Sequence, residues 1–261
     1  MGDGYPVLNI ENVSKSFGAL TAVNDVSFEL EDVGISGLIG PNGSGKTTLF
    51  HLITGFYKLD TGNIHFLNQK ISGLAPHIIS QRGIVRTFQQ TRVLPFLSSL
   101  DNLIAAAPHQ AGEKIINLFL RPAKVAAEEA QNSEKALSIL ETLELTKVRF
   151  SPAGDLSYGQ QKLLEIGRVL MADPRLIILD EPTAGINPVL IRHLVKILQN
   201  LRDQSIKIFL IEHNMPLVSE LCDEIFVMDS GSLIFSGTPG EVQNNPRVIE
   251  AYLGRQHAAE A

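Results

Sequence analysis

One short glycine-rich segment, residues 40–47, constrains this chain more than any other part of its sequence. An apolar stretch runs directly into the segment, and a stretch of helical character follows it and ends near Gly55. The segment fits the pattern G-x-x-x-x-G-K-[ST] in full, with Gly40, Pro41, Asn42, Gly43, Ser44, Gly45, Lys46 and Thr47, followed by Thr48. In such a strand–loop–helix unit backbone N–H groups turn inward around a polyphosphate, Lys46 reaches the β- and γ-phosphates, and Thr47 offers a hydroxyl to Mg²⁺. The segment predicts that the chain binds a nucleoside triphosphate, but it does not indicate what the nucleotide is used for.

The rest of the chain has the pattern of an α/β domain with a helical insert. Its 261 residues, 44% of them hydrophobic, suit one large domain with a substantial core. Residues 101–144 are rich in Ala and predict helices, with a break at Pro122. The flanking regions predict strands at 7–10, 23–30 with a break at Asn24-Asp25, 33–39, 176–179 and 206–211, a helix at 188–201, and a hairpin over 225–235.

Composition narrows the function classes. The chain has 22 Lys and Arg against 28 Asp and Glu, a net charge of −6, which argues against general nucleic-acid binding and against adhesion to anionic lipid. The single cysteine, Cys222, excludes an internal disulfide framework and a Cys-based zinc site. No apolar stretch approaches the roughly 20 residues of a membrane-spanning helix, and the N-terminus has no secretory pattern. We therefore expect any membrane association to come through a protein partner.

Two adjacent acids follow the apolar run 176–179. Asp180 is expected to emerge at a strand end beside residues 40–47, where its carboxylate can hold Mg²⁺ or a metal-bound water. Neighbouring strand residues point in opposite directions, so Glu181 is expected to do different work. We interpret Glu181 as the group that orients and deprotonates an attacking water.

A second anion site is suggested at 156–160, Leu-Ser-Tyr-Gly-Gln. Ser157 and Gln160 form a capping-box pattern at the start of a helix that keeps Leu163, Ile166 and Leu170 on one face. One interpretation is an ordinary helix start. The other is that Ser157 and the free amides near Gly159 bind a further phosphate, which is more than one mononucleotide requires.

The glycine-rich segment, Leu-Ser-Tyr-Gly-Gln and the Asp180-Glu181 strand end, in that order along the chain, resemble the ATP-binding cassette (ABC) family. The family's usual signature is Leu-Ser-Gly-Gly-Gln, so Tyr158 departs from the commonest form. The resemblance covers residues 8–240 and implies an α/β P-loop NTPase core with an N-terminal antiparallel β subdomain and an inserted α-helical subdomain. The chain would then be a single domain, 1–261, with 92–170 approximately the helical subdomain. It also implies a head-to-tail dimer, with ATP between the P-loop of one subunit and Ser157, Gly159 and Gln160 of the other.

The resemblance assigns further positions. Gln89, in Arg-Thr-Phe-Gln, is similar to the glutamine that touches Mg²⁺ and the lytic water. His213 resembles the switch histidine at the γ-phosphate, and Phe17 the aromatic residue on which adenine stacks. Asn187 stands where the family usually has Asp, so a coupling that depends on that carboxylate is in doubt. Because Glu181 and His213 are both present, we expect a site that hydrolyses ATP, with Lys46 as a further catalytic residue. We also expect Thr47, Gln89 and Asp180 to form the metal site.

One subfamily fits best, the ATPase subunits of branched-chain amino acid importers. The similar features are Arg-Thr-Phe-Gln, the long insert, Leu-Ser-Tyr-Gly-Gln, Ala-Gly-Ile-Asn-Pro from Ala184 and Glu-Ala-Tyr-Leu-Gly from Glu250. The resemblance implies ATP and Mg²⁺ as cofactors, a second ATPase subunit of the same or a related kind, integral membrane permease subunits, a solute-binding protein, and a place on the cytoplasmic face of the inner membrane. Residues 115–120 either form a membrane-surface patch, pack into the helical subdomain or face a partner.

Other functions remain as alternatives. A transporter ATPase for urea, short amides or another solute has the same motifs. A soluble ABC ATPase acting on DNA or the ribosome usually has long coiled-coil arms or two cassettes, and neither is expected from this sequence. The excess of acidic residues also disfavours nucleic-acid binding. A P-loop kinase or GTPase leaves the signature and His213 unexplained. A regulatory module that does not hydrolyse ATP would be insensitive to Glu181→Gln.

Overall fold

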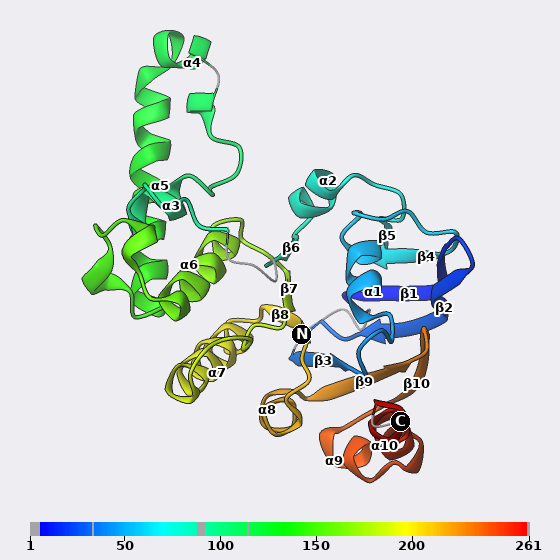
Figure 1. The fold of residues 1–261 in the computed structure, drawn as a ribbon. Coiled ribbons are helices and arrows are strands. Elements are labelled where there is room, and N and C mark those ends of the chain that lie inside the picture. Colours follow the sequence, from blue (N-terminus) through cyan, green and yellow to red (C-terminus); the bar gives the residue numbers. More distant parts are fainter. Residues whose placement is uncertain (1–5, 33, 88–91, 114, 260–261) are drawn as a thin grey trace. The chain divides into compact units, whose positions relative to one another are not determined.

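The computed structural model describes residues 6–32, 34–87, 92–113 and 115–259, which fall into two compact units (Figure 1). The first comprises Met1–Arg86, Arg175–Ala184 and Leu198–Ala261, and the second comprises Thr87–Pro174 and Gly185–Ile197. No helix among the described residues is both long enough and apolar enough to cross a bilayer.

The first unit is built on a six-stranded sheet in the order β10-β9-β3-β8-β7-β6. Its strands β3, β6, β7, β8 and β9 run parallel, and β10 pairs antiparallel with β9 as the expected hairpin. Every residue of β3, β7 and β8 is buried, as their solid apolar runs predict for strands covered on both faces. The bounds are β3 Ile35–Ile39, β6 Ile84–Arg86, β7 Leu176–Asp180, β8 Lys207–Ile211, β9 Glu224–Asp229 and β10 Ser232–Gly237.

A four-stranded antiparallel sheet, ordered β2-β1-β4-β5, completes the strands of the first unit. Its strands are β1 Leu8–Phe17, β2 Leu20–Leu30, β4 Thr61–Phe66 and β5 Gln69–Lys70. The expected break at Asn24-Asp25 is wrong, because β2 continues through both residues. The irregularity is absorbed by shifts in register against β1 and by a left-handed backbone at Asp25 (φ 50°). The residues that suggested a break in the strand therefore form a β-bulge within it.

The core of the first unit joins both sheets through the helix that follows the glycine-rich segment. Phe50 of α1 (Lys46–Ile53) lies 4.9 Å, centroid to centroid, from Phe209 of β8, and Phe28 of β2 lies 5.8 Å from the same ring. Phe28 also lies 4.4 Å from Phe226 of β9. This packing fixes α1, and hence residues 40–47, against the parallel sheet. The unit's other helices are α2 Pro76–Gln81, α8 Met215–Leu221, α9 Pro239–Asn244 and α10 Pro246–Ala259.

The second unit is helical. It contains α3 Ser99–Ile104, α4 Ile115–Leu120, α5 Pro122–Thr142, α6 Tyr158–Leu170 and the first part of α7 Pro188–Asp203, whose remainder belongs to the first unit. The break expected at Pro122 is the boundary between α4 and α5, because proline occupies the first turn of α5. Four apolar side chains of α4 are exposed, namely Ile115, Ile116, Phe119 and Leu120.

Candidate active site

The glycine-rich segment packs against the backbone of β9 and β2 at two glycines that leave no room for a side chain. A Cβ at Gly40 would lie 2.1 Å from the carbonyl oxygen of Met228, and one at Gly45 would lie 2.2 Å from that of Ala22. Both residues also adopt positive φ, at 150° and 101°. Gly45 is the N-cap of α1, and the N–H groups in the first turn of a helix have no acceptor within that helix, which suits them to binding an anion.

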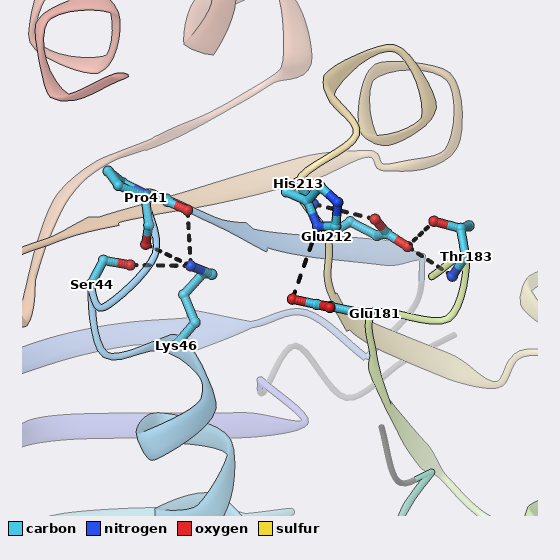
Figure 2. A network of polar contacts seen from close by, with 8 residues as sticks. Pro41, Ser44, Lys46, Glu181, Thr183, Glu212 and His213 are labelled. Atoms are coloured by element: carbon cyan, nitrogen blue, oxygen red, sulfur yellow. Dashed lines mark hydrogen bonds and ion pairs between the residues drawn. The ribbon is translucent and has the colours of Figure 1, made fainter. Parts of the chain in front are cut away.

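Lys46 is held inside this loop (Figure 2). Its Nζ donates to the carbonyl oxygens of Gly40 at 2.8 Å and Pro41 at 2.9 Å, and to Ser44 Oγ at 3.3 Å. The side chain is buried, with an exposed fraction of 8%. The ammonium group is therefore placed within the segment that the sequence assigns to the phosphates.

Asp180, the last residue of β7, is a buried carboxylate with a cation nearby. Its Oδ2 lies 3.7 Å from Arg86 Nη2 at the end of β6, and both side chains are less than 10% exposed. Burial raises the pKa of Asp180 most strongly, Arg86 and Lys46 lower it, and Glu181 raises it further. Arg86 was not predicted as part of the site, because its nearness to Asp180 follows from the pairing of β6 with β7.

Glu181 begins the turn after β7 and takes a left-handed backbone conformation, with φ at 48°. A residue with a Cβ rarely adopts this conformation, and such strain costs about 1–3 kcal/mol where the surroundings impose it. The Glu181 amide donates to the carbonyl oxygen of Ile211 at 3.0 Å, and its Oε1 lies 3.9 Å from His213 Nδ1 (Figure 2). The structure thus brings together two predicted residues that come from different strand ends.

The sequence analysis missed two residues of this network, Glu212 and Thr183. Glu212 is fully buried and accepts hydrogen bonds from Thr183 and from the amide of His213 (Figure 2). The sequence did contain a signal for Glu212, because this acid directly follows a solid apolar run, as Asp180 and Glu181 follow the run 176–179.

A cavity of about 500 Å³ lies over the glycine-rich loop. Its wall includes Glu181 and six of the residues predicted to bind the nucleotide, Asn42, Gly43, Gly45, Lys46, Thr47 and Thr48. Residues outside the prediction also line it, namely Leu20, Thr21, Ala22 and Ser230. A cavity of this size suits a nucleotide. It lies at the carboxyl ends of parallel strands, where α/β sheets bind ligands.

Phe17 is exposed at the end of β1, and its ring makes an edge contact with Tyr57 at 5.2 Å. Tyr57 in turn lies 4.8 Å from the ring of His51 on α1. Phe17 is thereby braced from α1, although it is not among the residues that line the cavity. Gln89 falls outside the described residues.

The signature residues lie in the second unit. Ser157 Oγ accepts from the Gln160 amide at 3.3 Å, and Gln160 Oε1 accepts from the Ser157 amide at 3.0 Å, which confirms the capping box. A Cβ at Gly159 would overlap Leu190 of α7. Asn187 caps α7 by accepting from the Leu190 amide at 3.0 Å, so it supplies the structural role of an aspartate without the charge.

The donor set near Lys46 fits a hydrated Mg²⁺. Asp180 and the Thr47 hydroxyl would supply oxygen ligands, and Mg²⁺ in such sites takes one or two carboxylates plus substrate phosphates. Among the described residues no group of three or more His, Cys, Asp or Glu side chains could hold a metal by themselves. The residues present therefore fit an ion that arrives with a nucleotide.

Comparison with known proteins identifies the family. The ABC transporter family model matches residues 23–184, and a model described as branched-chain amino acid ATP-binding cassette transporter matches residues 232–258. A probable branched-chain amino acid transport ATP-binding protein LivG from Archaeoglobus fulgidus is 41% identical over 250 residues, covering 96% of each chain. The high-affinity branched-chain amino acid transport ATP-binding protein BraF from Pseudomonas aeruginosa is 39% identical, covering 95% of this chain and 98% of its own.

Solved structures agree with this relationship. The ADP conformation of an ATP-binding cassette of an ABC transporter has a TM-score of 0.81 at 35% identity, covering 95% of this chain and 99% of its own. A nucleotide-free cassette has a TM-score of 0.81 at 38% identity, covering 95% and 98%. The expected fold is confirmed: an ABC ATPase with an antiparallel N-terminal sheet and a parallel core sheet. This chain belongs to the ABC transporter family, as an ATPase subunit of the group that includes LivG and BraF.

Proposed function

We propose that this chain hydrolyses ATP in an importer of branched-chain or related amino acids, and that Lys46, Glu181 and His213 carry the chemistry. The supporting observation is the cavity over the glycine-rich loop, whose wall contains both Lys46 and Glu181. The 3.9 Å approach of His213 to Glu181 adds the third group. The names of the relatives LivG and BraF support the solute class.

Each residue of the site has a distinct role in this proposal. The inward amides of residues 40–47 and the Lys46 ammonium bind the β- and γ-phosphates, and Lys46 stabilises charge on the transferred phosphoryl group. Glu181 orients the attacking water and accepts its proton, and His213 holds the γ-phosphate. Phe17, braced by Tyr57, offers a face on which adenine stacks. Base stacking on an aromatic ring contributes about 1–3 kcal/mol in nucleic-acid complexes.

Thr47 and Asp180 would hold Mg²⁺, with Gln89 as a further ligand by family resemblance. The ion, when bound, neutralises charge on the β- and γ-phosphate oxygens. Arg86 Nη2 lies 3.7 Å from Asp180 Oδ2, and we propose that this cation offsets part of the cost of burying the carboxylate.

A second ATPase subunit completes the site in this proposal. The N-terminus of α6, with Ser157, Gly159 and Gln160, would meet the γ-phosphate bound to the opposite chain in a head-to-tail dimer. The helical subdomain, approximately residues 92–170, carries this segment. Loss of the γ-phosphate removes the bridge between the chains, so the dimer reopens and drives the membrane subunits.

The partners and location follow from this role. We propose that the chain lies on the cytoplasmic face of the inner membrane, held by two integral permease subunits. A solute-binding protein outside delivers the amino acid to those permeases. The second ATPase is either another copy of this chain or a related one.

Purification from native membranes tests the proposal. A tagged chain, solubilised with detergent, is expected to retain two integral membrane proteins. When this complex is reconstituted with its solute-binding protein, it should take up labelled leucine, isoleucine and valine on addition of ATP. A Lys46→Ala complex, which lacks the phosphate-binding ammonium, serves as the inactive control. Uptake of urea or short amides in place of these amino acids would contradict the solute class, and a ribosomal or DNA-repair partner would contradict the transport role.

A further inference from the structure

Glu212 joins the ends of two neighbouring strands through a single buried carboxylate. Its Oε1 accepts from the Thr183 amide at 3.0 Å and from Thr183 Oγ1 at 2.5 Å. Its Oε2 accepts from the His213 amide at 3.2 Å. The residue has no exposed surface, and Thr183 is buried as well. One side chain therefore binds the turn after β7 to the loop after β8 (Figure 2).

The turn that Glu212 binds is the strained one. Glu181 has a left-handed backbone, its carbonyl oxygen accepts from the Ala184 amide at 3.1 Å, and its own amide is bound to Ile211. Strained conformations of this kind persist only where several contacts impose them. The bonds from Thr183 to Glu212 fix the far side of the same turn. On the other strand, the amide of His213 is fixed by the same carboxylate.

We infer that Glu212 is a positioning residue for ATP hydrolysis, which keeps Glu181 and His213 at a fixed position relative to one another. The inference rests on the catalytic roles proposed for these two residues. Glu212 itself is too buried to touch the nucleotide, so it acts through the backbone of the turn and of the histidine. Its effect should fall mainly on turnover, because none of its hydrogen bonds among the described residues reaches the glycine-rich loop, which with Lys46 holds most of the phosphate groups in this proposal.

The chemistry of the pocket requires a carboxylate rather than an amide. Both Glu212 oxygens receive a backbone N–H, from Thr183 on one side and His213 on the other, and a backbone N–H can only donate. In a Glu212→Gln variant the side-chain NH₂ must face one of these donors in either orientation. One strand end is then released while the side chain keeps its size, which makes this variant a selective probe.

The experiment compares variants of the full chain in its transporter complex, measuring kcat, KM, equilibrium ATP binding and thermal unfolding. We expect Glu212→Gln to lower kcat by about 100-fold, the loss typical of a small misplacement of catalytic groups, with the Kd for ATP within about twofold of wild type. Thr183→Val should lose part of the same activity, and Thr183→Ser, which keeps the hydroxyl, should recover most of it. Glu224→Gln is the matched control, because Glu224 is a partly buried carboxylate at the opposite end of the sheet, beside Ser36.

Two further measurements separate this inference from the roles on which it rests. Combining Glu212→Gln with Glu181→Gln should lower kcat no further than Glu181→Gln alone, because both act on one step. If Glu181→Gln retains full turnover, the proposed catalytic role is wrong. If that variant is inactive but Glu212→Gln has wild-type kcat, only the positioning role is overturned.

A parallel loss of ATP binding or a fall in melting temperature that accounts for the lost turnover would make Glu212 merely structural. Should Glu212→Gln fail to fold, equal kcat in Thr183→Val and Thr183→Ser would overturn the inference.

Discussion

Adjacent carboxylates at the end of β7 have different surroundings, which suits different tasks. Asp180 is buried beside Arg86, and burial is the largest influence on its pKa. Glu181 is less buried, takes a left-handed backbone and faces His213. The first environment favours holding a cation that arrives with the substrate, and the second favours contact with water in the cavity.

Asp180→Asn is expected to raise the stability of the nucleotide-free chain relative to wild type as the pH rises. A carboxyl whose pKa is raised by folding contributes stability while it is protonated and loses that contribution as the pH climbs through the raised pKa. The asparagine variant has no such group, so the difference in melting temperature should widen above about pH 4, the ordinary range of aspartate. Thermal unfolding from pH 4 to 8 measures it. A difference that shrinks with rising pH would contradict the assigned direction of the pKa.

Gly45→Ala is expected to destabilise the chain and to abolish ATP binding. Its Cβ would lie 2.2 Å from a backbone oxygen at a φ of 101°, so β2 or the loop must move. We expect a loss of about 2 kcal/mol or more, in the range for backbone strain combined with overpacking. Gly240→Ala in α9 is the control, because a Cβ there meets nothing within 4 Å and helical alanine is slightly favourable. Chemical denaturation and nucleotide titration measure both; similar behaviour of the two variants would contradict this account of the loop.

At this scale the sequence located the glycine-rich loop, the two acids and His213 because each lies within or beside a recognisable run. Arg86 and Thr183 could not be found in that way. Arg86 reaches Asp180 only through the pairing of β6 with β7, and Thr183 reaches Glu212 only through the pairing of β7 with β8. Neither register is encoded in a local pattern.

Elements carry the site through their ends. The N-terminus of α1 presents the amides proposed to bind phosphate, and the ends of β7 and β8 present the acids and the histidine. The N-terminus of α6 is closed by Ser157 and Gln160, so the cap that stabilises this helix uses the residues proposed to meet a phosphate. Stability and ligand binding at Ser157 therefore need separate tests.

Ser157→Asp and Ser98→Ala separate these roles. Aspartate is a good N-cap, so the first variant should keep its melting temperature, but its charge should repel the γ-phosphate and prevent ATP-dependent dimerisation. Ser98 caps α3 in the same unit, where its Oγ accepts from the Asp101 amide at 3.0 Å. Ser98→Ala should lose about 1 kcal/mol of stability and dimerise normally. Calorimetry and light scattering compare the two; dimerisation of Ser157→Asp with ATP would argue that the helix end meets no phosphate.

The strands and helices were largely predictable because solid apolar runs and capping patterns mark them. The break expected at Asn24-Asp25 was wrong because a bulge and a turn use the same residues, and only the partner strand distinguishes them. The exposed apolar side chains of α4 were equally beyond the sequence, since helical periodicity does not say whether another surface covers that helix.

The whole molecule assigns the proposed roles to separate units. The first unit holds the glycine-rich loop, Asp180, Glu181 and His213, and the second holds the signature segment. In a head-to-tail dimer each nucleotide would need one unit from each chain, which couples hydrolysis to the separation of subunits. The family and fold could be predicted from the order of motifs. The partner chain could only be inferred from resemblance, because no motif records a surface that forms between two molecules.

Light scattering of Glu181→Gln with ATP and Mg²⁺ tests this coupling most directly. The variant keeps the phosphate-binding groups but lacks the proposed base, so we expect ATP to accumulate uncleaved and the mass of the purified chain to double. Lys46→Ala, which lacks the ammonium in the loop, should remain at the monomer mass under the same conditions. If Glu181→Gln binds ATP at full occupancy and stays monomeric, or hydrolyses it at the wild-type rate, the proposed shared site is contradicted.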